Sequence, residues 1–282
     1  EDTYRTLTAV DAAVMVLDAA KGIESQTRKL FEVCRLRDIP IVTFINKMDR
    51  EGRDPLDLLD EIEKTLALDV TPAAWPLGQG RDLVGVYDIL NPALRLLSDD
   101  GDRHVKLSGL DDPALDSQAA PELVAALREQ AELVQAGYPE LDREAFLQGT
   151  MTPVFFGSAL RDFGVGHLLD GMAALAPAPG RRAADARQVE PGEEKLTGFV
   201  FKVQANMDPN HRDRVAFLRI CSGRLEKGMR LAQVRTGKQV PVNAPLFFFA
   251  KDRQVAEQAW PGDVVGIANH GILRIGDTLT EG

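Results

Sequence analysis

Two short runs of consecutive, largely apolar residues constrain the fold most, AAVMVL at 12–17 and PIVTFI at 40–45. Neither run alternates with polar residues, which is typical of strands covered on both faces, as in parallel sheets. Between them Leu30 and Cys34 lie on one apolar stripe at helical spacing, so we expect a helix over 23–37, with Cys34 in the core. Strand, helix and strand in this order predict a βαβ unit with a parallel sheet.

The pattern continues downstream with an interruption. Asp54 and Pro55 are a good N-cap and first residue for a helix whose apolar stripe extends to Leu66. The acidic stretch 79–150 breaks the alternation of strands and helices and is predicted to be an insertion. The remaining expected elements are strands at 71–78, 84–90 and 151–160 and helices at 121–136 and 164–175.

A change of composition divides the chain. Residues 176–195 are rich in proline and charge and poor in large apolar residues, which is typical of a linker. Beyond them, short β-rich runs alternate with Gly, Pro, Asp and Asn, and this predicts a small antiparallel barrel.

Polar residues follow the second apolar run directly: Asn46, Lys47 and Asp49. In open α/β sheets, ligands bind at the carboxyl ends of strands. A carboxylate there can accept hydrogen bonds from the N1–H and 2-amino groups of guanine, whereas adenine N1 is an acceptor and would repel it. Asn46 can complement the acceptor edge of the base, and the stem of Lys47 can cover its face. This Asn-Lys-x-Asp pattern is the base-recognition element of GTP-binding proteins.

A second motif supports the first. The stretch FFGSAL places Ser158, Ala159 and Leu160 after a later predicted strand. In GTPases, the loop at this place donates backbone N–H groups to the O6 atom of guanine. Asn46 and Ser158 lie 112 residues apart in the sequence, so an insertion has to separate them, and segment 79–150 fits that role.

Several long stretches carry a family resemblance: EDTYRTLTAVDAAVMVLDAAKGIESQTRKL, RLRDIPIVTFINKMDREGRDPLDLLDEIE, WPLG, TPVFFGSAL, GFVFKVQANMDPNHRDRVAFLRICSG and PGDVVGIANHG with IGDTLTEG. On these, the chain resembles the bacterial peptide chain release factor 3 family of translational GTPases over essentially its whole length. Translocase-type elongation factors share the layout, but RDPLDLLDEIE and QANMDPNHRDRVAF look more like the release factor family.

The resemblance implies a fold and a function. It implies a partial α/β GTPase domain at 1–178 that contains the inserted subdomain 79–150, a linker at 179–195, and a translation-factor β-barrel at 196–282. It further implies a cytoplasmic, monomeric translation termination factor that binds GTP and GDP, with Mg²⁺ in the full-length protein. Such a factor releases class I release factors from the ribosome, where it contacts ribosomal RNA and protein, and it has no membrane partner.

The sequence also departs from the family. It contains no G-x-x-x-x-G-K-[S/T] phosphate loop and no D-x-P-G-H stretch, so the groups that hold phosphates and Mg²⁺ and position the attacking water are absent from it. We therefore expect an internal fragment of a GTPase that is inactive by itself, with no catalytic or metal-binding residues of its own. Residues 1–9 would be the end of the switch II helix.

Two alternatives remain open: a fragment of a translocase-type elongation factor, or a non-catalytic ribosome-binding module. For the module, the candidate basic surface is Lys202, His211, Arg212, Arg214 and Arg219. Charge favours different partners for the two parts, because residues 1–195 hold 21 Lys and Arg against 35 Asp and Glu, while 196–282 hold 12 against 8. The four histidines show no metal-ligand spacing and are expected on the surface or in loops: His104, His167, His211 and His270.

Overall fold

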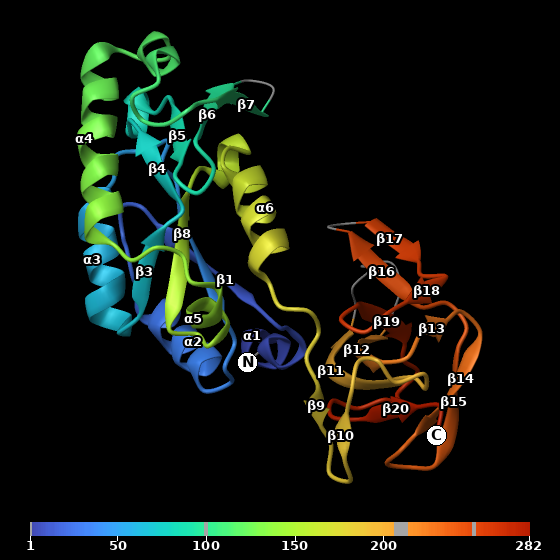
Figure 1. Ribbon diagram of the computed structural model, residues 1–282. Helices are drawn as coiled ribbons and strands as arrows, with labels where there is room; N and C mark the ends of the chain where they lie inside the picture. Colours follow the sequence, from blue (N-terminus) through green and yellow to red (C-terminus); the bar gives the residue numbers. More distant parts are fainter. Residues whose placement is uncertain (1, 99–100, 206–213, 250–251) are drawn as a thin grey trace. The chain divides into compact units, whose positions relative to one another are not determined.

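The computed structural model describes residues 2–98, 101–205, 214–249 and 252–282. It divides into two compact units, Ala12–Ala176 and a second unit formed by Glu1–Asp11 together with Pro177–Gly282. The family resemblance, in contrast, implies a first domain that begins at residue 1, and that boundary remains a prediction. Figure 1 shows the course of the chain through both units.

The first unit is built on a four-stranded parallel sheet in the order β1-β2-β8-β3. Its strands are β1 (Ala13–Asp18), β2 (Ile41–Asn46), β8 (Met151–Phe156) and β3 (Asp69–Pro72). Strands β2 and β8 are buried almost throughout, as their apolar runs predict. Strand β1 differs, because it lies at the edge of the sheet and its Val14 and Val16 are 39% and 54% exposed.

Helices cover this sheet. They are α2 (Ser25–Arg35), α3 (Pro55–Leu66), α5 (Arg143–Leu147) and α6 (Val165–Leu175), and in Figure 1 α3 and α6 lie on opposite sides of β8. Asp54 caps α3 as expected, since its Oδ1 accepts a hydrogen bond from the Leu56 N–H at 2.8 Å. Cys34 is buried on α2, which confirms its expected place in the core.

The acidic segment folds as an antiparallel sheet with a long helix. Its elements are β4 (Ala74–Leu77), β5 (Gly85–Asp88), β6 (Ala93–Ser98), β7 (Gly101–Lys106) and α4 (Pro121–Gly137), with 3₁₀ turns at Gly80–Asp82 and Pro113–Ser117. Trp75 joins this sheet to the parallel one, because its buried ring packs edge-on against Phe156 at 5.6 Å between centroids. Its Nε1–H donates to Gln130 of α4 at 3.0 Å.

The second unit is built on an eight-stranded sheet with antiparallel pairing, in the order β15-β14-β20-β11-β12-β19-β16-β17, which confirms the predicted antiparallel β domain. The strands are β11 (Thr197–Ala205), β12 (Arg214–Ser222), β14 (Met229–Gln233), β15 (Lys238–Val242), β16 (Leu246–Phe249), β17 (Asp252–Val255), β19 (Val264–Ala268) and β20 (Thr278–Thr280). The short pair β13 (Leu225–Glu226) and β18 (Gln258–Ala259) accompanies it. The predicted linker itself contains a two-stranded pair, β9 (Arg182–Ala183) and β10 (Gln188–Val189).

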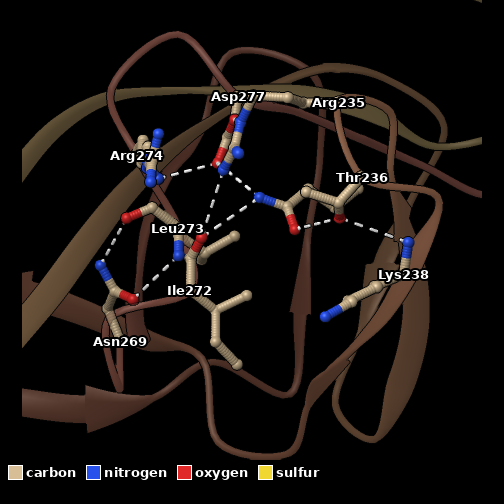
Figure 2. A network of polar contacts seen from close by, with 9 residues as sticks. Arg235, Thr236, Lys238, Asn269, Ile272, Leu273, Arg274 and Asp277 are labelled. Carbon is tan, nitrogen blue, oxygen red and sulfur yellow. Dashed lines mark hydrogen bonds and ion pairs between the residues drawn. The ribbon is translucent and has the colours of Figure 1, made fainter.

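A buried polar network fixes the loop that leads from β19 to β20 (Figure 2). The carboxylate of Asp277 accepts hydrogen bonds from Gln233 Nε2 and Arg235 Nε, both at 2.6 Å, and from the Arg274 N–H at 2.8 Å. The side chain of Asn269 bonds Leu273 through both its oxygen and its nitrogen. The loop is therefore held by satisfied buried groups at both of its ends.

The start of the chain packs within the second unit. Residues 2–9 form the short helix α1 (Asp2–Thr6) and a 3₁₀ turn (Leu7–Ala9). Arg219 holds the end of this turn and the residues after it, because its guanidinium donates to the Ala9 carbonyl at 3.0 Å and pairs with the carboxylate of Asp11. The expectation that Arg219 belongs to an exposed basic surface is wrong, because the residue is 5% exposed and its guanidinium is engaged by these contacts.

Candidate functional site

The candidate site lies where three parallel strands end at the same edge of the sheet. Asp18 at the end of β1 is paired in register with Asn46 at the end of β2, and Ile45 of β2 is paired with Phe156 of β8. The loops that follow the three strands therefore meet. The strand ends and these loops contain all six residues that the sequence indicates for base recognition: Asn46, Lys47, Asp49, Ser158, Ala159 and Leu160.

The Asn46 side chain joins two of these loops. Its Oδ1 accepts hydrogen bonds from the Lys47 N–H at 2.8 Å and from the Ala159 N–H at 2.9 Å. Its main-chain carbonyl accepts from the Ala19 N–H at 2.9 Å. Within the part of the chain that the structure describes, no hydrogen bond uses the Asn46 amide nitrogen, so both of its hydrogens remain available to a ligand acceptor.

Met48, the variable position of the Asn-Lys-x-Asp pattern, anchors the loop. Its side chain is fully buried, its N–H donates to the Gly157 carbonyl at 3.0 Å, and its carbonyl accepts from the Gly80 N–H at 2.8 Å. The turn closes with a bond from the Arg50 N–H to the Lys47 carbonyl at 3.1 Å. Because hydrogen bonds fix the backbone of Met48 on both sides, the backbone positions from which the Lys47 and Asp49 side chains extend are fixed as well.

Asp49 is half-buried, and its Oδ1 is a buried atom with no hydrogen-bond partner among the described residues. The hydroxyl oxygen of Ser158, also fully buried, is in the same situation. A buried polar atom without a partner costs about 1–3 kcal/mol, so such atoms call for an explanation. A ligand with N–H donors would satisfy the Asp49 carboxylate, and the edge of guanine offers two of them.

Lys47 adopts an unusual backbone conformation, with φ at 69°, and its side chain is 45% exposed. Its Nζ lies 2.7 Å from Asp18 Oδ2. Asp18 also caps the turn after β1, because its Oδ1 accepts from the Ala20 N–H at 2.9 Å. Sequence reasoning missed the pairing of Asp18 with Lys47. The shared position of the two residues at the carboxyl ends of adjacent strands is the signal that could have revealed it.

The loop after β8 is closed on itself. The Ser158 N–H donates to the Phe163 carbonyl at 2.9 Å, and the Phe163 N–H returns a bond to the Ser158 carbonyl at 3.0 Å. The Ala159 N–H is bound to Asn46, as described above. Two of the three backbone donors that the pattern indicates are thus engaged with protein oxygens. Leu160 is 76% exposed, so its side chain is open to solvent beside the site.

Comparison with known proteins shows the family of the chain. Residues 1–178 match the model of the elongation factor Tu GTP binding domain, which covers more than half of the chain. The chain belongs to the translational GTPase family. This membership implies guanine nucleotide binding, and residues 195–282 match a second module of the family, elongation factor G domain 2.

A crystal structure of a protein from Thermus thermophilus resembles the whole chain, with a TM-score of 0.75 and 25% sequence identity. The match covers 99% of this chain and 42% of that one. The chain therefore spans less than half the length of that protein.

One histidine lies elsewhere than expected. His167 is not in a loop or on the surface but is buried on helix α6, with its Nε2 3.0 Å from Asp88 Oδ2 and its ring edge-on to Phe155. Arg95 approaches the same carboxylate at 3.7 Å. This cluster fastens the inserted sheet to α6. His211 and Arg212 lie outside the described residues.

Metal-binding and membrane-spanning features are absent from the described ranges. These ranges hold no group of three or more His, Cys, Asp or Glu side chains placed to bind a metal ion. None of the helices in them has the length and apolar character needed to span a lipid bilayer.

Proposed function

We propose that the loops after β2 and β8 bind the guanine base of GTP and GDP. In this proposal the carboxylate of Asp49 accepts hydrogen bonds from N1–H and the 2-amino group, and the Asn46 amide nitrogen donates to the acceptor edge. The Lys47 stem covers one face of the base, and the loop at 158–160 supplies a backbone donor for O6. The observation that carries the proposal is the buried, unpartnered Oδ1 of Asp49 in a loop whose backbone is fixed by hydrogen bonds on both sides of Met48.

The proposal assigns base recognition to these residues and no chemical step. Hydrolysis of GTP would need a phosphate loop, a Mg²⁺ ion and a positioned water, and this sequence has no phosphate-loop pattern. We therefore expect the 282-residue chain to bind guanine nucleotides weakly and not to hydrolyse them, and we place the GTPase activity in a longer protein that also carries those elements.

For the biological role, we propose a cytoplasmic, monomeric translation termination factor that acts on ribosomal RNA and protein and promotes GTP-dependent release of class I release factors. Support comes from the order of the two matched modules and from the sequence stretches that resemble the release factor 3 family. The proposed domain boundaries are 1–178, with 79–150 inserted, a linker at 179–195, and 196–282.

A translocating elongation factor is the second candidate, because the model matched at 195–282 is named for elongation factor G. The two roles separate in a reconstituted system, where a termination factor accelerates dissociation of a bound class I release factor and a translocase advances the ribosome by a codon. A ribosome-binding module without nucleotide specificity is the third candidate function. The candidate basic surface for it is reduced, since Arg219 is buried and Lys202 is 3.3 Å from Asp2.

Base discrimination by the chain itself tests the proposed site. In an amide NMR titration, guanosine 5′-monophosphate should shift the signals of residues 46–49 and 158–160, and adenosine 5′-monophosphate should leave them nearly unchanged. A polar site left unpaired by the wrong base rejects it strongly, which gives the expected preference for guanine. Equal shifts with both nucleotides, or shifts confined to other residues, would refute the site.

A further inference from the structure

Lys47 has a strained backbone that no helix end explains. Among the described residues, the non-glycine residues with positive φ are Asp38, Lys47, Ala67 and Asp162. Asp38, Ala67 and Asp162 end helical turns, where a left-handed residue is common. Lys47 instead follows a strand, in the loop of the proposed base site. A strained residue that its surroundings hold in place is a reason to look for a function.

The side chain of Lys47 is held by a residue from the neighbouring strand. Its ammonium lies 2.7 Å from Asp18 Oδ2, while the other carboxylate oxygen of Asp18 is bonded to the Ala20 N–H. Asp18 is itself well covered, with a side chain 16% exposed. The hydrogen bond from Lys47 and the N–H of Ala20 lower the pKa of Asp18, so the carboxylate stays charged at neutral pH. One carboxylate thus contacts both the turn after β1 and the ammonium of the Lys47 side chain.

We infer that Asp18 is a positioning residue for base binding: through its ion pair it holds the Lys47 stem in place as the surface on which the guanine base rests. This inference depends on the proposed function of the loop and adds to it a residue outside the Asn-Lys-x-Asp pattern. A free lysine side chain samples many rotamers, and a bound base would have to immobilise it. With the ammonium already tethered, the stem is arranged before the base arrives, and affinity rises accordingly.

The test uses Asp18→Asn in the chain, because asparagine retains an oxygen acceptor for the Ala20 N–H and loses the charge that holds Lys47. We expect the affinity for guanosine 5′-monophosphate to fall roughly 2- to 10-fold, the range for losing one pre-ordered side chain. The control is Asp60→Asn, which removes the carboxylate of another Lys–Asp pair, Lys64–Asp60 at 2.6 Å on α3, and should leave the affinity unchanged.

A double-mutant cycle separates positioning from a general structural role. In a Lys47→Met background the unbranched stem remains but its charge is gone, so Asp18→Asn should cause no further loss of affinity. The rate of reductive methylation of the Lys47 amine should rise in Asp18→Asn, while that of the exposed Lys29 should not change.

The outcomes are distinct. If Asp18→Asn left both the methylation rate and the affinity unchanged, or weakened binding equally in the Lys47→Met background, the positioning role would be overturned while guanine recognition stood. If the unsubstituted chain bound guanosine and adenosine monophosphates equally, the proposed function would fail, and this inference with it. A loss of affinity in Asp18→Asn that is absent from the Lys47→Met background supports both the guanine site and the positioning role of Asp18.

Discussion

At the residue scale, the buried carboxylates of Asp88 and Asp277 both have hydrogen-bond partners within the protein. Each is about 2–3% exposed and is bonded by cationic or polar side chains together with a backbone N–H. Asp49 Oδ1 is buried too but lacks any such partner among the described residues. The contrast is the reason to regard Asp49 as a ligand group, because structural carboxylates in the same molecule are satisfied internally.

The pair of Asp88 and His167 makes a pH-dependent contribution to stability. Burial alone would raise the pKa of Asp88, but the hydrogen bond and charge of His167, the Asn91 N–H and Arg95 outweigh burial and lower it. Because folding lowers this pKa, the stabilisation is present above the unfolded value of about 3.9 and is lost as the pH falls through the folded value. We therefore predict that Asp88→Asn costs the first unit about 3 kcal/mol of unfolding free energy near neutral pH.

Urea unfolding measures the change in unfolding free energy. It is followed by the fluorescence of buried Trp75 in a Trp260→Phe background, where Trp75 is the sole tryptophan. The cost of Asp88→Asn should begin to shrink below about pH 4, where the unfolded carboxylate takes up a proton, and should be lost as the pH falls through the lower pKa of the folded state. Asp170→Asn is the matched control, because Asp170 also contacts Arg95, at 3.2 Å, but its side chain is 69% exposed. Equal losses for the two variants, or a loss independent of pH, would contradict the role given to burial.

At the element scale, the junction between β8 and the loop after it depends on Gly157. Its N–H donates to the Ile45 carbonyl and its carbonyl accepts from the Met48 N–H, so it joins the two loops of the site. A Cβ at this position would lie 2.3 Å from the Phe163 carbonyl oxygen and 2.8 Å from the Phe44 ring. Since the first of these is backbone, the loop itself would have to move.

Gly157→Ala should therefore both destabilise the first unit, by about 1–3 kcal/mol, and weaken binding of guanosine 5′-monophosphate. Gly137→Ala is the matched control, because a Cβ there meets nothing within 4 Å, and it should change neither quantity. Thermal unfolding and the nucleotide titration check both parts. Unchanged nucleotide binding in a folded Gly157→Ala variant would show that the loop after β8 does not contribute to the site.

The elements that the sequence predicts well are those that a pattern of neighbouring residues identifies without knowledge of tertiary contacts. The strands β2 and β8 have continuous apolar runs, helices α3 and α4 have clear periodicity and a proline at the start, and each element lies within a few residues of its predicted range. The exposed face of β1 could not be foreseen in the same way, because an apolar run does not reveal whether a strand is central or at an edge.

At the scale of the whole molecule, the errors have a common physical origin. His167 meets Asp88, Arg219 meets Asp11, and Lys47 meets Asp18 only because the fold brings together residues far apart in the sequence. Local spacing carries no trace of such pairs, so a buried arginine and a surface arginine look alike in the sequence. The order of modules and the base-recognition motif, by contrast, are local patterns in the sequence, and the family match to both modules agrees with their order.

The central claim is that the Asp49 carboxylate accepts hydrogen bonds from the N1–H and 2-amino groups of guanine. Replacing one acceptor oxygen of Asp49 by a donor tests this claim most directly. Asp49→Asn replaces one carboxylate oxygen by an N–H donor, which repels the 2-amino group of guanine and suits the 2-oxo group of xanthine. We predict that the unsubstituted chain binds guanosine 5′-monophosphate over xanthosine 5′-monophosphate and that Asp49→Asn reverses this preference, with guanosine affinity falling about 10-fold or more. An Asp49→Asn chain that keeps full guanosine affinity and gains nothing for xanthosine would contradict the account.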